Sequence, residues 1–211
     1  MYRPKLNTVL LLALALAAPV LPAQNIEPSA LLQSATLEVI AAIKQERAAH
    51  DGNPKQVAHV VETKVLPLFD FPRMTQIAVA RNWRLATPQQ QAALTAEFKT
   101  LLVHTYSAAL SSYRDQVIEF RGTRTAPADS DVTVRSVVKQ SGTEPVAMDY
   151  DMEKTPAGWK VYDIKVAGVS LVTTYRDTFS TRIREDGVDG LIKALADKNR
   201  QGDSPPRAPK T

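Results

Sequence analysis

The sequence predicts an α+β fold in which helices cover one face of a four-stranded antiparallel sheet. Apolar residues recur at helical spacing in the first half of the chain, at alternate positions between residues 116 and 167, and at helical spacing again over residues 170–197. The order of helices, four strands and helices is typical of a segregated sheet that has one apolar face and one polar face.

The composition limits the classes of protein that this chain can represent. Of its 211 residues, 44% are apolar and 23% are charged, which excludes wholesale disorder and a multi-pass membrane protein. It contains no cysteine, so disulfides, thiolate metal sites and a cysteine nucleophile are excluded. The net charge of +4 arises at the two ends, because residues 24–197 carry 20 basic and 21 acidic side chains. This near-neutral body argues against nucleic-acid binding.

Both ends of the chain are expected to lie outside the folded domain. Arg3 and Lys5 precede an apolar run over residues 9–18, and Ala23 follows, which is typical of a secretory signal peptide over residues 1–23. The run is shorter than the ~20 residues that span a bilayer, and the alternative is an uncleaved N-terminal helix. The proline-rich residues 198–211 predict a disordered tail. The folded domain should therefore span residues 24–197 of an exported, soluble protein.

Four helical segments are predicted in the first half. The first runs from Pro28 to about residue 49, and a second covers residues 57–68 with an interruption at Pro67. A third, short helix begins at Pro72. The sequence Thr87-Pro-Gln-Gln90 is a capping box that starts the fourth and longest helix.

The strands are predicted at residues 116–124, 131–139, 145–153 and 159–166. The third alternates most clearly, because its even-numbered residues from 146 to 152 are apolar and most odd-numbered ones are acidic. Gly168 is expected to end the sheet and Ser170 to cap the next helix. Gly187 should stop that helix, and a last one carries Leu191 and Leu195.

The chain lacks the usual catalytic patterns. His50, His59 and His104 have no second ligand at helical spacing, and neither a phosphate-binding glycine loop nor a G-x-S-x-G elbow occurs. Asp163 breaks the alternation of the last strand, so it is a candidate general base with a raised pKa. Alternatively, Asp163 pairs with a basic residue such as Arg176 or points to solvent. We expect no enzymatic activity and no cofactor.

Several motifs together resemble the MlaC family of toluene-tolerance type periplasmic phospholipid carriers. Phe69-Asp-Phe71 is followed by Trp83-Arg84, and Trp159-Lys-Val-Tyr-Asp163 is followed by Val166-Ala-Gly-Val-Ser-Leu171 and by Tyr175-Arg176. The resemblance covers roughly residues 28–197. The chain departs from it at Val79-Ala-Arg81, where the family commonly has a leucine-glycine pair.

The resemblance implies a curved sheet and helices that enclose a deep apolar cavity for the acyl chains of a phospholipid, which is cargo and not a cofactor. It also implies two membrane partners, an inner-membrane lipid transporter with a ring-forming lipid-binding subunit and an outer-membrane lipoprotein–porin complex, in a system that keeps outer-membrane lipid asymmetric. A hopanoid or another apolar ligand is the alternative cargo. A cavity enzyme that uses Asp163 and an interaction module with a filled core are the other hypotheses. The expected lipid-binding residues are Met74, Ile77, Trp83, Leu102, Tyr106, Leu110, Val134, Met148, Tyr150, Val166, Val169, Leu171, Tyr175 and Phe179.

Overall fold

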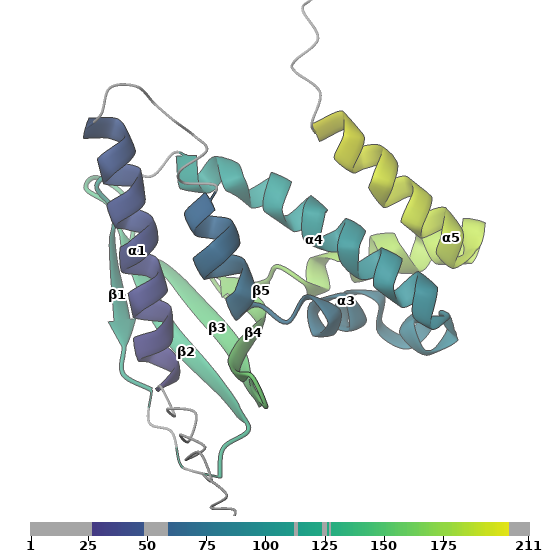
Figure 1. Cartoon of the computed structure of the whole chain (residues 1–211), viewed down its shortest axis with the longest axis horizontal. Helices are drawn as coiled ribbons and strands as arrows, with labels where there is room; N and C mark the ends of the chain where they lie inside the picture. The colour runs from purple at the N-terminus through teal and green to yellow at the C-terminus, as the bar shows by residue number, and fades with distance from the viewer. Residues whose placement is uncertain (1–26, 49–58, 112–113, 124–125, 127, 203–211) are drawn as a thin grey trace, which may run out of the picture.

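The computed structural model describes residues 27–48, 59–111, 114–123, 126 and 128–202 (Figure 1). The predicted signal peptide, His50 and residues 203–211 of the predicted tail lie outside these ranges. The α+β prediction is confirmed, because helices precede and follow a single antiparallel sheet. None of the described helices is long and apolar enough to cross a membrane.

The sheet contains five strands instead of the predicted four, in the spatial order of the sequence. They are β1 (Val117–Arg121), β2 (Asp131–Lys139), β3 (Val146–Thr155), β4 (Gly158–Val166) and β5 (Val169–Ser170). Gly168 does not end the sheet, since Ala167 and Gly168 both have positive φ and turn the chain back on β4. Two consecutive residues of positive φ suit a two-residue hairpin.

A β-bulge explains the break in alternation at Asp163. Asp151 pairs with Asp163 but its neighbour Met152 pairs with Val161, so Tyr162 is the extra residue. A bulge leaves one residue unpaired and shifts the side-chain alternation of its strand. Apolar side chains of β4 on both sides of the bulge therefore remain on one face of the sheet, and Asp163 lies on the other.

Helix α1 (Pro28–Ala48) crosses the apolar face of the sheet, which we call the inner face (Figure 1). The predicted second helix continues into a π-helical turn, η1 (Val61–Val65), and a 3-10 turn, η2 (Leu66–Leu68). After it, Phe69 pairs with Val161 on the free edge of β4, and the Asp70 N–H donates to the Val161 carbonyl at 2.8 Å.

The remaining helices form a second group beside the sheet (Figure 1). It consists of α3 (Phe71–Val79), η3 (Ala80–Leu85), α4 (Pro88–Ser111), η4 (Thr173–Tyr175) and α5 (Arg176–Gly202). The predicted capping box is confirmed, because the N–H groups of Thr87 and Gln90 each donate to the other's side chain, at 3.0 and 3.2 Å. The Ser170 hydroxyl accepts from the N–H of Thr173, the first residue of η4, at 2.9 Å, although Val172 is the N-cap position of this turn before α5.

Helix α5 differs from the prediction at two places, at Gly187 and at its C-terminal end. Gly187 has φ 72° and ψ −176°, so the two predicted helices are joined across a sharp kink. The helix continues to Gly202, and the predicted start of the tail at Lys198 is therefore wrong. Asn199 is buried and donates to the backbone oxygen and a carboxylate oxygen of Glu97, at 2.9 and 2.7 Å. These bonds hold the last turns against α4, and sequence composition alone does not reveal them.

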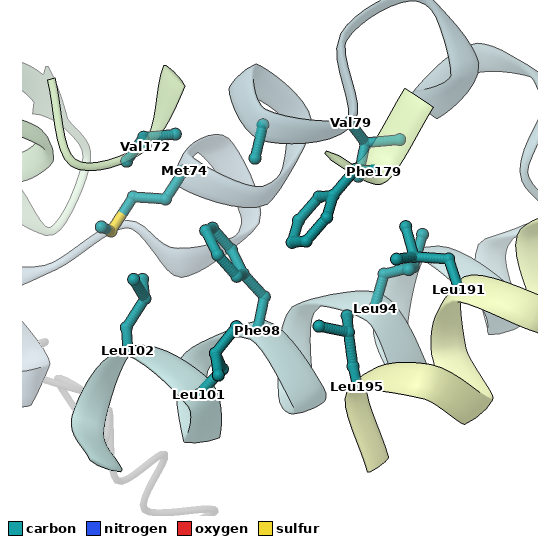
Figure 2. Packing of buried hydrophobic residues seen from close by; sticks show 11 residues of the cluster. Met74, Val79, Leu94, Phe98, Leu101, Leu102, Val172, Phe179, Leu191 and Leu195 are labelled. Carbon is teal, nitrogen blue, oxygen red and sulfur yellow. The ribbon is translucent and has the colours of Figure 1, made fainter. Parts of the chain in front are cut away.

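Two apolar clusters form the core. The helical cluster joins α3, α4 and α5 around Phe98, whose ring meets that of Phe179 edge to face (Figure 2). The ring of Tyr175 also meets that of Phe98 edge to face. The sheet cluster places Leu32 of α1 against Val134, Met152, Trp159 and Val161. Phe69 packs against both clusters. The segment between η2 and α3, which lies at the edge of β4, therefore joins them.

Candidate functional site

The described residues hold no group of three metal-ligating side chains. His59 is exposed ahead of η1, and His104 is half-buried on α4. Asp163 is only 5% exposed and accepts a hydrogen bond from the Val172 N–H at 3.3 Å. The alternative that it pairs with a basic residue such as Arg176 is not seen, since no ion pair of Asp163 occurs among the described residues and the Arg176 guanidinium donates to the Ile77 carbonyl at 2.9 Å. The alternative that it points to solvent is wrong.

The inner face of the sheet divides into a packed end and an open end. At the packed end, Leu32 of α1 covers Val134 and Met152, which are 0% exposed. At the open end, apolar side chains on two successive cross-strand rows keep contact with solvent, Val146 at 40% and Val169 at 57% exposure. The residues of the open end are Ile118, Val138, Val146, Met148, Val166 and Val169.

The apolar side chains of the open end are neighbours across the strands. Val138 stands opposite both Ile118 and Val146, and Val166 stands opposite both Met148 and Val169. Contiguous apolar surface on a soluble protein commonly marks a ligand or interaction site. The geometry therefore offers an apolar surface without a catalytic group at its centre.

Two tyrosines add hydroxyl groups to the half-buried apolar surface. Burial raises the pKa of Tyr150, and a side-chain hydrogen bond in which the Tyr150 oxygen accepts from Ser136 offsets part of this effect. Burial also raises the pKa of Tyr106, as do the nearby charge and hydrogen bond of Tyr175. Both phenols therefore stay neutral at physiological pH and can donate or accept a hydrogen bond.

The structure distributes the predicted lipid-binding residues over three places. Met74, Leu102 and Phe179 are buried in the helical cluster, with Ile77, Trp83, Tyr106 and Tyr175 packed against it. Val134 and Tyr150 belong to the sheet cluster, and Met148, Val166 and Val169 lie at the open end. Leu171 is half-buried in neither cluster, and the Leu110 side chain lies outside the described residues.

Sequence reasoning missed Ile118, Val138 and Val146, which share the open end with Met148 and Val166. Ile118 and Val146 alternate with polar or exposed positions in the predicted strands, and that alternation was the available signal for them. What it did not reveal was how much of each inner-face side chain remains exposed in the fold.

Comparison with known proteins finds a matching family model and two curated relatives. Residues 33–197 match the family model described as MlaC protein. The chain is 26% identical to the toluene tolerance protein Ttg2D of Pseudomonas putida over 207 residues, which are 93% of this chain and 94% of that one. It is 20% identical to the intermembrane phospholipid transport system binding protein MlaC of Haemophilus influenzae, over 80% of each chain.

A solved structure agrees with the fold. The phospholipid-binding protein of Ralstonia solanacearum, determined in complex with a phospholipid, is 42% identical and superimposes with a TM-score of 0.75. The match covers 84% of this chain and 99% of that one. The family model spans most of the described residues and agrees with the motifs from Phe69 to Arg176. The chain thus belongs to the MlaC family.

Proposed function

We propose that this protein is a phospholipid carrier that binds the acyl chains against the open end of the inner face. The observation that carries the proposal is the exposure of apolar side chains on two adjacent rows of the sheet, next to the buried Val134 and Met152 that pack with Leu32. The names of the relatives and the phospholipid held by the Ralstonia protein support the same function.

The energetics of lipid binding need no polar catalyst. Two acyl chains carry about 30 methylenes, and at ~0.8 kcal/mol each their burial is worth roughly 24 kcal/mol before costs. This exceeds the practical ceiling on non-covalent affinity of about 18–21 kcal/mol, so the ordering costs are readily met. Release is then the harder step, and it requires donor and acceptor complexes that compete for the chains.

The wall of the proposed site consists of side chains that retain accessible surface. Met148, Val166 and Val169 of the sheet meet this condition, as do the half-buried Tyr106, Tyr150 and Tyr175. A side chain that is 0% exposed, such as Val134, borders no space large enough for a water molecule. Of the residues expected from the sequence, we assign Val134 to the packing behind the wall, together with Met74, Leu102 and Phe179, which are at most 6% exposed.

Lipid that co-purifies with two matched variants tests the proposal. We expect wild-type protein to carry close to one diacyl phospholipid per chain by native mass spectrometry. Met148→Glu should stay folded and lose most of this lipid, because a carboxylate at the open end can be hydrated once lipid is absent. Val134→Glu is the control. It should lose several kcal/mol of stability, because it places an unpaired charge in a packed core.

Two outcomes contradict this assignment. Unfolding of Met148→Glu would show that the open end is a filled core, and unchanged lipid in a folded Met148→Glu would remove Met148 from the wall.

The mass of the bound lipid also distinguishes a phospholipid from a hopanoid. Wild-type protein that is empty after gentle purification supports an interaction module. A turnover that Asp163→Asn abolishes supports an enzyme.

The proposed carrier works in the periplasm, between the two membranes. The basic and apolar pattern of residues 1–23 supports export followed by cleavage after Ala23. The proposed donors and acceptors are an inner-membrane transporter with a ring-forming lipid-binding subunit and an outer-membrane lipoprotein–porin complex. N-terminal sequencing of protein from the periplasm should find Gln24 first, and an intact Met1 there would contradict the export proposal.

A further inference from the structure

A polar cleft of about 530 Å³ lies on the outer face of the sheet, opposite the inner face. It exists because the two strands beside it differ in length. The last pair between β1 and β2 joins Arg121 to Arg135, so residues 131–134 of β2 have no β1 partner. Besides the two arginines, the polar residues that line the cleft are Thr123, Asp129, Asp131 and Thr133.

Two guanidinium groups share this cleft. Arg121 and Arg135 are directly opposite each other on neighbouring strands, and both are exposed. No ion pair engages either arginine in the part of the chain that the structure describes, although Asp149 stands opposite Arg135 on its other side. Like charges directly opposite in a sheet are destabilising. An anion bound between the two guanidinium groups would relieve the repulsion between them.

The two carboxylates of the cleft have other partners. Asp129 accepts a hydrogen bond from the Ala126 N–H at 2.7 Å, and Asp131 lies 3.8 Å from the Arg73 guanidinium. The Thr133 hydroxyl donates to Asp151 at 2.8 Å. The donors that remain for a ligand are therefore the two guanidinium groups, and their planar forks match the oxygen atoms of phosphate.

We infer that this cleft binds a phosphate group, held between the guanidinium groups of Arg121 and Arg135. The source of that group is either free phosphate or the anionic headgroup of a lipid in a bilayer surface. The cleft is on the opposite face of the sheet from the open end, so the phosphate that it takes is not the headgroup of the carried lipid. Because arginine stays protonated at all physiological pH values, binding should not weaken as the pH rises from about 6 to 9.

A titration of the mature full chain with inorganic phosphate tests the inference. We expect saturable binding by isothermal calorimetry that is weakened about tenfold or more in Arg121→Gln and in Arg135→Gln, as for the loss of a charge-assisted hydrogen bond. Arg182→Gln is the control. This exposed arginine pairs with Asp186 on α5, and neither residue lines the cleft. Equal binding in all four proteins would overturn the inference.

Thermal unfolding gives an independent readout. Phosphate should raise the melting temperature of wild type and of Arg182→Gln only, since a ligand stabilises the state that binds it. In the absence of phosphate, Arg121→Gln and Arg135→Gln should melt no lower than wild type, because each removes the repulsion between the two arginines. A clear loss of stability in both variants without phosphate would show that the arginines serve the fold and would contradict the inference.

Vesicle binding separates the two sources of the phosphate group. If the source is a bilayer headgroup, wild type should co-sediment with phosphatidylglycerol vesicles and not with phosphatidylcholine vesicles, and either arginine variant should lose this binding. Added salt should weaken it. Arginine-dependent binding of inorganic phosphate without vesicle binding assigns the cleft to free phosphate. If both probes fail, the inference is wrong.

Discussion

A carboxylate oxygen of Asp163 accepts a hydrogen bond from the backbone N–H of Val172 at 3.3 Å, and both residues are buried. This bond connects the bulged part of β4 to the segment that enters η4, across the β5 hairpin. A carboxylate in this position links the end of the sheet to the start of the following helical turn. This structural role requires a hydrogen-bond acceptor and not a general base.

The first prediction follows from this bond. Asp163→Asn keeps an oxygen acceptor for the Val172 N–H and should change the free energy of unfolding little. Asp163→Leu removes the acceptor and leaves a buried N–H unpaired, at a cost of about 1–3 kcal/mol. Urea denaturation of the two variants measures the difference. Equal destabilisation by both substitutions would show that the negative charge matters, and not the acceptor.

A second prediction concerns Ala80, which ends α3 with φ 54° and ψ −129°. A residue with a Cβ atom is strained at such positive φ, and glycine is not. Ala80→Gly should therefore stabilise the protein by about 1 kcal/mol, less the entropy that glycine costs in the unfolded chain.

The matched control is Ala157→Gly in the exposed turn between β3 and β4, where φ is not positive. It should be neutral or slightly destabilising, because only the entropic effect of glycine applies there. Chemical denaturation of both variants measures the contrast. If Ala80→Gly loses as much stability as Ala157→Gly, the strain at Ala80 is negligible.

The end of α5 provides a third prediction. Asn199→Ala removes two hydrogen bonds to Glu97 from a buried position and should cost about 1–3 kcal/mol. A chain that ends after Lys198 should lose at least as much. Removal of residues 203–211 alone should leave the melting temperature within about 1 °C of wild type, since polar, proline-rich residues bury little apolar area. A large loss on the shorter truncation would show that these residues dock.

The fourth prediction is a pH dependence at the outer face. Lys165 lies 2.7 Å from Asp151, and this hydrogen-bonded pair raises the pKa of Lys165 above its ordinary value of 10.5. The folded state then holds the Lys165 proton more tightly than the unfolded state does. The stabilisation is fully present below pH 10.5 and is lost as the pH rises through the raised pKa.

Denaturation at a series of pH values measures this effect. The difference in unfolding free energy between wild type and Lys165→Met should be constant from about pH 7 to 9 and shrink above about pH 10.5. Lys44→Met, at an exposed position of α1, serves as the control for general effects of alkaline pH. A difference that does not change up to about pH 11.5 would mean that the ion pair contributes nothing to stability.

Local features of the fold could be predicted from the sequence because they depend on neighbouring residues. The capping box at Thr87 and Gln90 is complete within four residues. The alternation in β3 separates Met148 and Tyr150 from Asp149 and Asp151 without reference to any other strand. Gly187 was predicted to end a helix, and the helix axis does change there, because its φ of 72° suits glycine.

Features that depend on pairing between distant segments could not be predicted in this way. The break at Asp163 was visible, but only the register between β3 and β4 identifies it as a bulge that turns Asp163 toward Val172. The composition after Lys198 is that of a tail, yet Glu97 provides partners for Asn199 from 102 residues away. A hydrogen bond of this range leaves no local signal in the sequence.

The sequence by itself determined the α+β class, the positions of the helices and long strands, the apolar face of the sheet and the membership of the MlaC family. Only the tertiary structure decided which part of that face is covered. Val134 and Met148 have the same pattern in the sequence, but Leu32 of α1 packs over the first and leaves the second half-exposed. The physical reason is that periodicity specifies the side of a segment that avoids water, whereas packing between segments decides whether protein or a ligand provides the cover.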